Sequence, residues 1–396
     1  MVRGVNEKQT LSESTASYEA WVDRHTPTVP VARAGKHALM ATGPFPFMRA
    51  TYYRWAGFAA ALPAPPGPVV GAVGDLHVEN FGTWRDAEGR LTWGINDLDE
   101  ADRLPAAFDL LRLATSVEIA RAHAGLVLPG GDVVSILLDG YARALRPQGL
   151  STILERPGPL PIDRLLPVSH AQRWWDRLAA LPPAPDAPAR AVTLLTQALP
   201  RTAGPVTVHH RTAGLGSRDH VRFAGVADVF GAPAAREVKA LAPPATWWLA
   251  ERSGRPVQRG RVGALANELL ARAHRSPDPS LRLRGTWVVR RLAPWADRIE
   301  IADLRARADI EALLIAMGAE TANLHLATAG GQELQALTTK PARRWLIASA
   351  HEMVEATLRD AAAWQKLMAK RATTERATTE PATTEPTTKR TTATRS

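Results

Sequence analysis

The chain has 396 residues, of which 45% are apolar, and a net charge of +10 at pH 7. Apolar residues in that proportion can fill the cores of two or three domains or lobes. The absence of cysteine excludes disulfides, thiolate zinc sites and thiol nucleophiles. Apolar runs stop well before the ~20 residues that a bilayer span requires, and the first residues do not resemble a secretion signal. We therefore expect a cytoplasmic protein without a membrane segment.

The positive charge is compatible with a polyanionic partner, because lysine and arginine release counterions when they meet phosphates. The arginines are spread over helical patterns, without an aromatic-interleaved basic stripe or zinc-finger spacing. Nucleic acid is therefore not expected as the main partner. The same charge suits a pocket for ATP.

Two apolar runs in the first half of the chain are typical of buried strands. Residues 69–73 are followed by Asp75, and residues 91–95 are followed by Asp97. Each strand delivers polar residues at its end, and we expect the second strand to lie alongside the first. Asp109 is then expected to cap a helix, because apolar residues recur after it at helical spacing.

The second half begins with the pattern of a β-hairpin. Apolar residues alternate on both sides of a glycine turn at 214–217, and residues 237–241 alternate charged and apolar residues as a half-buried strand would. Helical patterns follow at 309–327 and 341–368. Between the two halves, residues 146–205 are rich in proline around one helical segment, which indicates a connector.

The densest polar cluster is the run Gly-Asp-Leu-His-Val-Glu-Asn at 74–80, which is followed by Asp97 and Asp99. Phosphoryl transfer needs a carboxylate that takes the proton of the acceptor hydroxyl, and oxygen ligands that hold Mg²⁺ against the phosphates. Asp75, Asn80 five residues later and the strand ending in Asp97 supply that set. Each residue alone is more typical of a turn or cap, but the spaced set favours a functional site.

A second candidate group lies in the other half of the chain. Gly214, Gly216 and Ser217 form a glycine turn that lets peptide N–H groups approach phosphates, and Lys239 on the next strand can reach the α- and β-phosphates. A plain hairpin turn is the alternative. Glu268, in a helical pattern, is the candidate ion-pair partner of Lys239, with a solvated surface charge as the alternative.

Two of these motifs resemble those of the aminoglycoside and choline phosphotransferases. Residues 73–80 are similar to their catalytic loop, His-Gly-Asp-x-His-x-x-Asn, with Val73 in place of the first histidine. Residues 95–101 resemble their metal-binding segment, and residues 108–110 resemble the helix start that follows it.

By this resemblance, Asp75 is the catalytic base, and Asn80 and Asp97 are Mg²⁺ ligands. Asp99 is a further candidate ligand. His77 is a catalytic candidate by its place in the motif, with bracing of the loop as the alternative.

Nearly the whole chain also resembles an uncharacterised bacterial family, domain of unknown function 2252. The shared segments are the two acidic motifs and residues 46–54, 214–217, 236–241, 290–294 and 320–325. This family has no substrate known to us, so the resemblance bears on the fold more than on the reaction.

The resemblances imply an α+β, protein-kinase-like fold of two lobes that is circularly permuted, with a helix-rich catalytic lobe and a small β-rich nucleotide-clamping lobe. In ordinary kinases the glycine loop and the lysine precede the catalytic loop, whereas here they follow it. The expected segments are a flexible N-terminus at 1–20, the catalytic-loop and metal-site part of the large lobe at 21–145, a proline-rich helical connector at 146–205, the β-rich lobe at 206–300, helices completing the large lobe at 301–371 and a disordered low-complexity tail at 372–396.

The expected function is transfer of the γ-phosphate of ATP, with Mg²⁺, to the hydroxyl of an unidentified small-molecule or protein acceptor. One alternative is a pseudokinase-like module that binds a nucleotide or a protein without transfer. Another is a metal-dependent phosphoesterase, which would work without ATP. The sequence does not indicate the acceptor, the oligomeric state or a preference for ATP over GTP.

Overall fold

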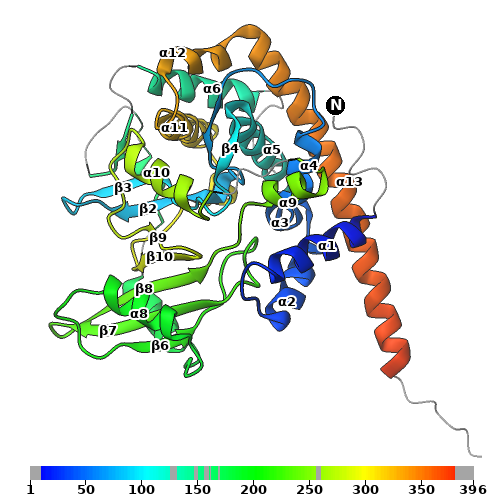
Figure 1. The fold of residues 1–396 in the computed structure, drawn as a ribbon. Coiled ribbons are helices and arrows are strands. Elements are labelled where there is room, and N and C mark those ends of the chain that lie inside the picture. The colour runs from blue at the N-terminus through cyan, green and yellow to red at the C-terminus, as the bar shows by residue number, and fades with distance from the viewer. Residues whose placement is uncertain are drawn as a thin grey trace, which may run out of the picture.

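A computed structural model of the chain describes residues 10–124, 132–146, 150–155, 160, 162–167, 170–255 and 260–379. Within these residues the fold is α+β, with thirteen α-helices and three sheets. Figure 1 shows most helices in a large part and the largest sheet in a smaller part below it. No described helix is long and apolar enough to cross a membrane.

The elements follow one another along the chain with these bounds. The helices are α1 (Leu11–Asp23), α2 (Pro30–Met40), α3 (Pro44–Ala50), α4 (Tyr52–Ala59), α5 (Ala106–Ala124), α6 (Asp132–Ala144), α7 (Ala171–Ala179), α8 (Ala189–Ala198), α9 (Ala245–Arg252), α10 (Ala264–Arg272), α11 (Arg307–His325), α12 (Gly331–Leu334) and α13 (Lys340–Thr379). The strands are β1 (Val69–Ala72), β2 (Phe81–Arg85), β3 (Leu91–Ile95), β4 (Asp102–Pro105), β5 (Thr152–Ile153), β6 (Thr207–His210), β7 (Arg222–Val229), β8 (Ala232–Ala240), β9 (Arg282–Leu283) and β10 (Trp287–Leu292).

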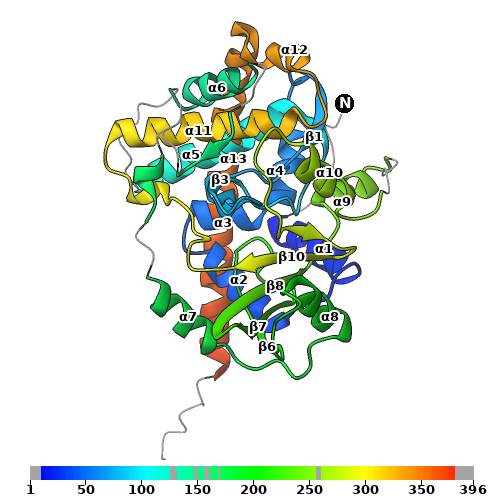
Figure 2. The same ribbon diagram turned by 90° about the vertical axis from the view of Figure 1, so that its left-hand side faces the viewer.

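In the large part, helices α6 and α11 lie side by side with their backbones in contact (Figure 2). A Cβ atom added to Gly140 would lie 1.9 Å from the carbonyl oxygen of Ile315, and one added to Gly318 would lie 2.0 Å from that of Leu137. Only glycine fits at both positions. This close contact fixes the position of α11, whose last turn carries His325, a partner of Asp109.

The two strands that precede the acidic residues lie in different sheets. β1 pairs with β4, whereas β3 lies between β2 and β5. The expectation that Asp75 and Asp97 follow neighbouring strands is therefore wrong. Both strands are buried, as their apolar runs predict, but burial does not reveal which strand is the partner.

The smaller part is a five-stranded antiparallel sheet in the order β6-β7-β8-β10-β9, with α7 and α8 packed on it. The hairpin expected on either side of residues 214–217 is present as β6 and β7. Leu195 of α8 shares an apolar cluster with Val238, and Leu178 of α7 shares another with Ala235. Because neighbouring strand residues point to opposite faces, α7 and α8 cover opposite faces of the sheet (Figure 2).

The proline-rich connector expected at 146–205 therefore belongs largely to the smaller part. It contains two α-helices, α7 and α8, where one helical segment was expected. Pro188 is the N-cap residue of α8 and directly precedes its first helical residue.

Near the N-terminus, helical structure begins at a lower residue number than expected. α1 begins at Leu11, where the Thr10 side chain accepts from the Glu13 amide at 3.2 Å and forms a capping box. Tyr18 stacks on Tyr53 with ring centroids 4.2 Å apart. Of the flexible segment expected at 1–20, only residues 1–9 lie outside the described residues.

Two other boundaries differ from the expected ones. α13 continues to Thr379, into the segment expected to be a disordered tail, and residues 380–396 lie outside the described residues. Within the segment 206–300, α9 and α10 pack on the large part. Trp248 of α9 meets Tyr53 with ring centroids 5.8 Å apart, and Leu269 of α10 belongs to the same large core.

Candidate active site

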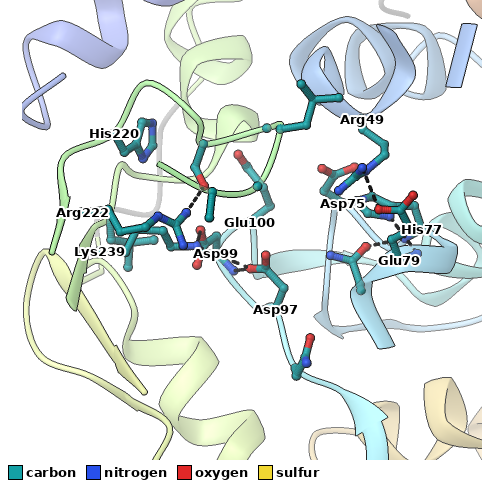
Figure 3. A pocket seen from close by; sticks show the side chains of 18 of the residues that line it. Arg49, Asp75, His77, Glu79, Asp97, Asp99, Glu100, His220, Arg222 and Lys239 are labelled. Carbon is teal, nitrogen blue, oxygen red and sulfur yellow. Dashed lines mark hydrogen bonds and ion pairs between the residues drawn. The ribbon is translucent and has the colours of Figure 1, made fainter. Parts of the chain in front are cut away.

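A cavity of about 500 Å³ lies between the five-stranded sheet and the large part (Figure 3). Most residues predicted for the site line it: Asp75, His77, Asn80, Asp97, Asp99, Gly214, Gly216, Ser217 and Lys239. Glu268 does not line it. Groups that are far apart in the sequence therefore meet in one place.

Asp75 follows a sharp turn at the end of β1. Gly74 has φ +84°, and a Cβ atom there would lie 2.3 Å from the carbonyl oxygen of Glu100. Any other residue would be strained and would clash. Asp109 accepts from the Val73 and Gly74 amides at 2.7 and 2.9 Å, which fixes the turn.

Asp109 has a different role from the predicted one. α5 begins at Ala106, so Asp109 lies in its first turn rather than capping it. The carboxylate also meets His325 Nε2 at 3.0 Å, and Tyr141 Oη lies 2.8 Å from Nδ1 of the same ring. All three side chains are buried. The turn that precedes Asp75 is thus tied to α5, α6 and α11.

Asp75 pairs with Arg112 of α5, whose Nε and Nη2 donate to Oδ1 at 2.9 and 2.6 Å. Arg112 is fully buried and also donates to the Met48 carbonyl. Burial raises the pKa of Asp75 to about 6, although Arg112 acts in the opposite direction. A carboxylate with that pKa is still mostly ionised at neutral pH but is more basic than an ordinary aspartate, as suits a general base.

His77 and Asn80 brace each other. The His77 amide donates to Asn80 Oδ1 at 2.7 Å, and His77 Nδ1 accepts from the Glu79 amide at 3.2 Å. Burial, with Arg49 nearby, holds the pKa of His77 well below its usual range, so the ring is neutral. Because its Nδ1 is occupied as an acceptor, the geometry favours the bracing role for His77 over proton transfer.

Lys239 bridges two carboxylates of the acidic motif. Its Nζ is in contact with Asp99 and lies 4.0 Å from Asp97 Oδ1, while the Asp99 amide donates to Asp97 at 3.3 Å. Burial acts to raise the pKa of Asp97, but the charge of Lys239 and, to a smaller extent, that of Arg290 lower it below its usual value. Both carboxylates are therefore held near a cation from the sheet.

The residues fit a magnesium ion by their chemistry. Asp97, Asp99 and the second lone pair of Asn80 Oδ1 offer oxygen atoms only, and all three side chains line the cavity. Among the described residues, no group of three or more His, Cys, Asp or Glu side chains could hold a metal ion. Mg²⁺ does not require one, since it commonly binds one or two carboxylates together with waters and phosphates of a substrate.

Glu268 is not the partner of Lys239, contrary to the prediction. It pairs with Arg272 at 3.0 Å, one turn along α10, and lies 3.7 Å from Arg103. The reason is the packing of α10 against the large part, which directs this side chain toward β4.

The glycine turn presents peptide groups to the cavity. Gly214 has φ +72°, a conformation that favours glycine. In the described part of the chain, the amides of Gly214, Gly216 and Ser217 donate to no protein acceptor. Unpaired N–H groups in such a turn form a concavity that suits an anion.

The end of this turn is held by α2, a contact that the sequence does not reveal. Asp219 accepts from Arg33 at 2.9 Å and from Lys36 at 3.2 Å, and the Val29 amide donates to its carbonyl at 2.7 Å. The turn is therefore anchored on the N-terminal helices rather than free.

Carboxylates beyond the predicted ones also line the cavity, and Glu100 is among them. Glu100 accepts from the Ala245 amide at 2.6 Å, and burial raises its pKa to about 8. Figure 3 shows it between Asp75 and Asp99. Glu237 lies two residues before Lys239 on β8, behind the cavity lining, and accepts from Arg222, Arg290 and Arg211, which directly follows β6.

Comparison with known protein families gives a match over part of the chain. Residues 28–150 match the model of a family described as an uncharacterized protein conserved in bacteria (DUF2252). This segment contains the loop of Asp75 and the acidic motif, but not the glycine turn or Lys239. No curated protein and no solved structure matches the chain. The similarity to this family is thus found over part of the chain, and no comparison points to a kinase.

Proposed function

We propose that the chain is an ATP- and Mg²⁺-dependent phosphotransferase that acts on a hydroxyl group. The observation that carries the proposal is the meeting, in one cavity, of Asp75, the carboxylates of Asp97 and Asp99, and Lys239 beside the glycine turn. A proton acceptor, oxygen ligands and a phosphate-binding cation are the parts that phosphoryl transfer requires.

In this proposal the protein groups divide the work along the cavity. Asp75, held by Arg112, orients the acceptor hydroxyl and takes its proton as the oxygen attacks the γ-phosphorus. The bond from that phosphorus to the β–γ bridging oxygen breaks, and ADP leaves. Lys239 and the free amides of the turn bind the phosphates. Asp97, Asp99 and Asn80 would hold Mg²⁺, which supplies positive charge to the β- and γ-phosphates when bound.

We further propose that the two parts correspond to the lobes of a circularly permuted kinase-like fold. Lys239 lies on the third strand of its sheet in chain order, as the phosphate-binding lysine of protein kinases does. The connector that precedes the sheet passes along both of its faces as α7 and α8. A connector along that path joins the acidic motifs to a sheet that follows them in the chain, which is the reverse of the order in ordinary kinases.

Two observations favour a second candidate, a pseudokinase-like module that binds nucleotide without transfer. Lys239 contacts Asp99 rather than a helix glutamate, and Val73 replaces the first histidine of the resembled loop. Both candidates require Mg-ATP binding, and only the phosphotransferase requires turnover.

Lys239→Ala tests the nucleotide site. Removal of one charged phosphate contact is expected to weaken Mg-ATP binding by about 1.5 to 3 kcal/mol, measured by titration calorimetry. Lys366→Ala, which removes an exposed lysine of α13, is the matched control and should leave the affinity unchanged. Equal affinities for both variants, with melting temperatures near that of the parent chain, would show that Lys239 does not bind the phosphates.

The raised pKa of Asp75 predicts the pH dependence of turnover. Only the ionised carboxylate accepts a proton, so kcat/KM should fall about tenfold per pH unit below about pH 6. An ordinary aspartate would hold its rate to about pH 4. The charged and titratable groups around Asp75 include Arg112, Asp97, Arg49 and Glu100. The profile is measured with an acceptor or, before one is found, as ATP hydrolysis, and a flat profile from pH 5 to 7 contradicts the assignment.

A further inference from the structure

The sheet face that points into the cavity is charged beyond Lys239. Arg222 of β7 lies opposite Lys239 in the strand register, and Arg290 of β10 lies opposite Glu237. Residues two apart on a strand share a face, so Glu237 and Lys239 point the same way. The next residue on this face, Ala235, packs under α7. The open part of the face is therefore occupied by ionic side chains.

Three guanidinium groups surround the one carboxylate of Glu237. Arg222 Nη1 and Arg290 Nε donate to it at 2.8 Å each, and Arg211 Nη1 also contacts it. The side chain of Glu237 is 1% exposed and that of Arg222 is 3% exposed, whereas Arg211 and Arg290 are 25% and 29% exposed. One buried carboxylate thus holds three cations at the cavity wall. Counted together with Lys239, Asp97 and Asp99, which act on the same cluster, four cations face three carboxylates, so one positive charge remains.

The same cluster is connected to the glycine turn. Arg222 Nη2 donates to Ser217 Oγ at 3.3 Å, and the three arginines, like the turn, line the cavity. Guanidinium groups match the oxygen geometry of phosphate and bind it with paired hydrogen bonds. The arginines and the free amides of the turn therefore offer one continuous surface for phosphates.

The large apolar side chains at the cavity wall offer little surface to a nucleobase. Tyr18, Val22 and Leu241 line the cavity, but they are 9%, 3% and 2% exposed because they belong to the large core. Leu215 of the turn is 7% exposed. A base bound between two parts of a protein normally rests on exposed apolar or aromatic groups. The described walls of this cavity instead provide charge.

We propose that Arg211, Arg222 and Arg290 extend the phosphate-binding site past Lys239, so that the donor is recognised by its chain of three phosphates and not by its base. This inference rests on the proposed function, because it assigns the donor of that same site. The phosphates run from the carboxylates of Asp97 and Asp99, along Lys239, to the arginine cluster. Figure 3 shows this direction, with Asp75 at one end and Arg222 at the other.

The inference predicts a pattern of ligand affinities in the full chain. With Mg²⁺ present, calorimetry should give dissociation constants for ATP, GTP and inorganic tripolyphosphate within about threefold of one another, whereas AMP should bind at least tenfold more weakly. Arg211→Met and, independently, Arg290→Met should weaken all three triphosphates by about tenfold or more. Two variants are used because either one alone could alter the sheet, and melting temperatures show whether it does.

Arg282→Met is the matched control, since it removes the same charge from an exposed position on β9 of the same sheet, outside this cavity. ATP binding at least tenfold tighter than both GTP and tripolyphosphate overturns the inference, as do folded arginine variants that bind like the control. In both cases loss of ATP binding in Lys239→Ala still supports the proposed function.

Two further outcomes are informative. The first shows whether the phosphates belong to a nucleotide or to an inorganic polyphosphate, and the second shows whether the cavity binds phosphates at all. If tripolyphosphate binds at least tenfold tighter than ATP and depends on the arginines, the phosphate site is supported and its donor is an inorganic polyphosphate, so the nucleotide part of the proposed function fails. If the parent chain binds no triphosphate at all, both the inference and the proposed function are overturned.

Discussion

Asp75→Asn is expected to lower turnover by roughly 10² or more while the affinity for Mg-ATP stays nearly unchanged. Asparagine keeps the size of the side chain and one oxygen that Arg112 can reach, but it cannot accept the proton of the acceptor. In the proposed arrangement Asp75 contacts the acceptor and not the nucleotide. Chemistry should therefore be lost and binding kept.

The measurement combines single-turnover or steady-state rates with calorimetry on the same preparation. Asp139→Asn, at an exposed position of α6, is the matched control and should behave as the parent chain does. Because Arg112 is buried beside Asp75, the melting temperature of the variant must be recorded as well. Loss of Mg-ATP affinity together with turnover, in a folded variant, would place Asp75 at the nucleotide rather than at the acceptor.

Local sequence pattern was enough to find the polar residues that follow strands. The runs before Asp75 and Asp97 are strands, and both residues lie in one cavity with Lys239, as their types and spacing predict. Strand ends collect such residues because the buried strand fixes the backbone while the following loop is free to present polar groups. The partner strands of β1 and β3 could not be predicted in this way, since continuous burial carries no information about register.

Partners from distant segments were not predictable from local pattern. Asp109 meets His325, which is 216 residues away, and the sequence around Asp109 reads equally well as a helix cap. The sequence pattern identified Glu237 only as a charged residue of a half-buried strand. Its arginines are 15, 26 and 53 residues away and face it only through the pairing of β6, β7, β8 and β10. Glu268 failed as a prediction for the same reason, because the packing of α10 decides where it points.

The buried contact of Asp109 leads to the largest expected change in stability. Its carboxylate accepts from the amides of Val73 and Gly74 and from His325, and neither Asp109 nor His325 is exposed to solvent. In Asp109→Asn, one of the two acceptor oxygens becomes an NH₂ donor that faces other donors. At least one buried N–H group is left without a partner, and each such group costs about 1 to 3 kcal/mol.

We expect Asp109→Asn to lower the free energy of unfolding by about 2 to 5 kcal/mol, because a buried carboxylate that accepts three hydrogen bonds is replaced by an amide that accepts at only one oxygen. Urea unfolding at constant pH measures it. Asp309→Asn is the matched control, because Asp309 also lies in the first turn of a helix, α11, but its pair with Arg164 is partly exposed. That control should lose no more than about 1 kcal/mol through the helix dipole and the surface pair. If the two variants unfold alike, the buried bonds of Asp109 contribute no more than a surface pair, and the turn that carries Asp75 must be held by other contacts.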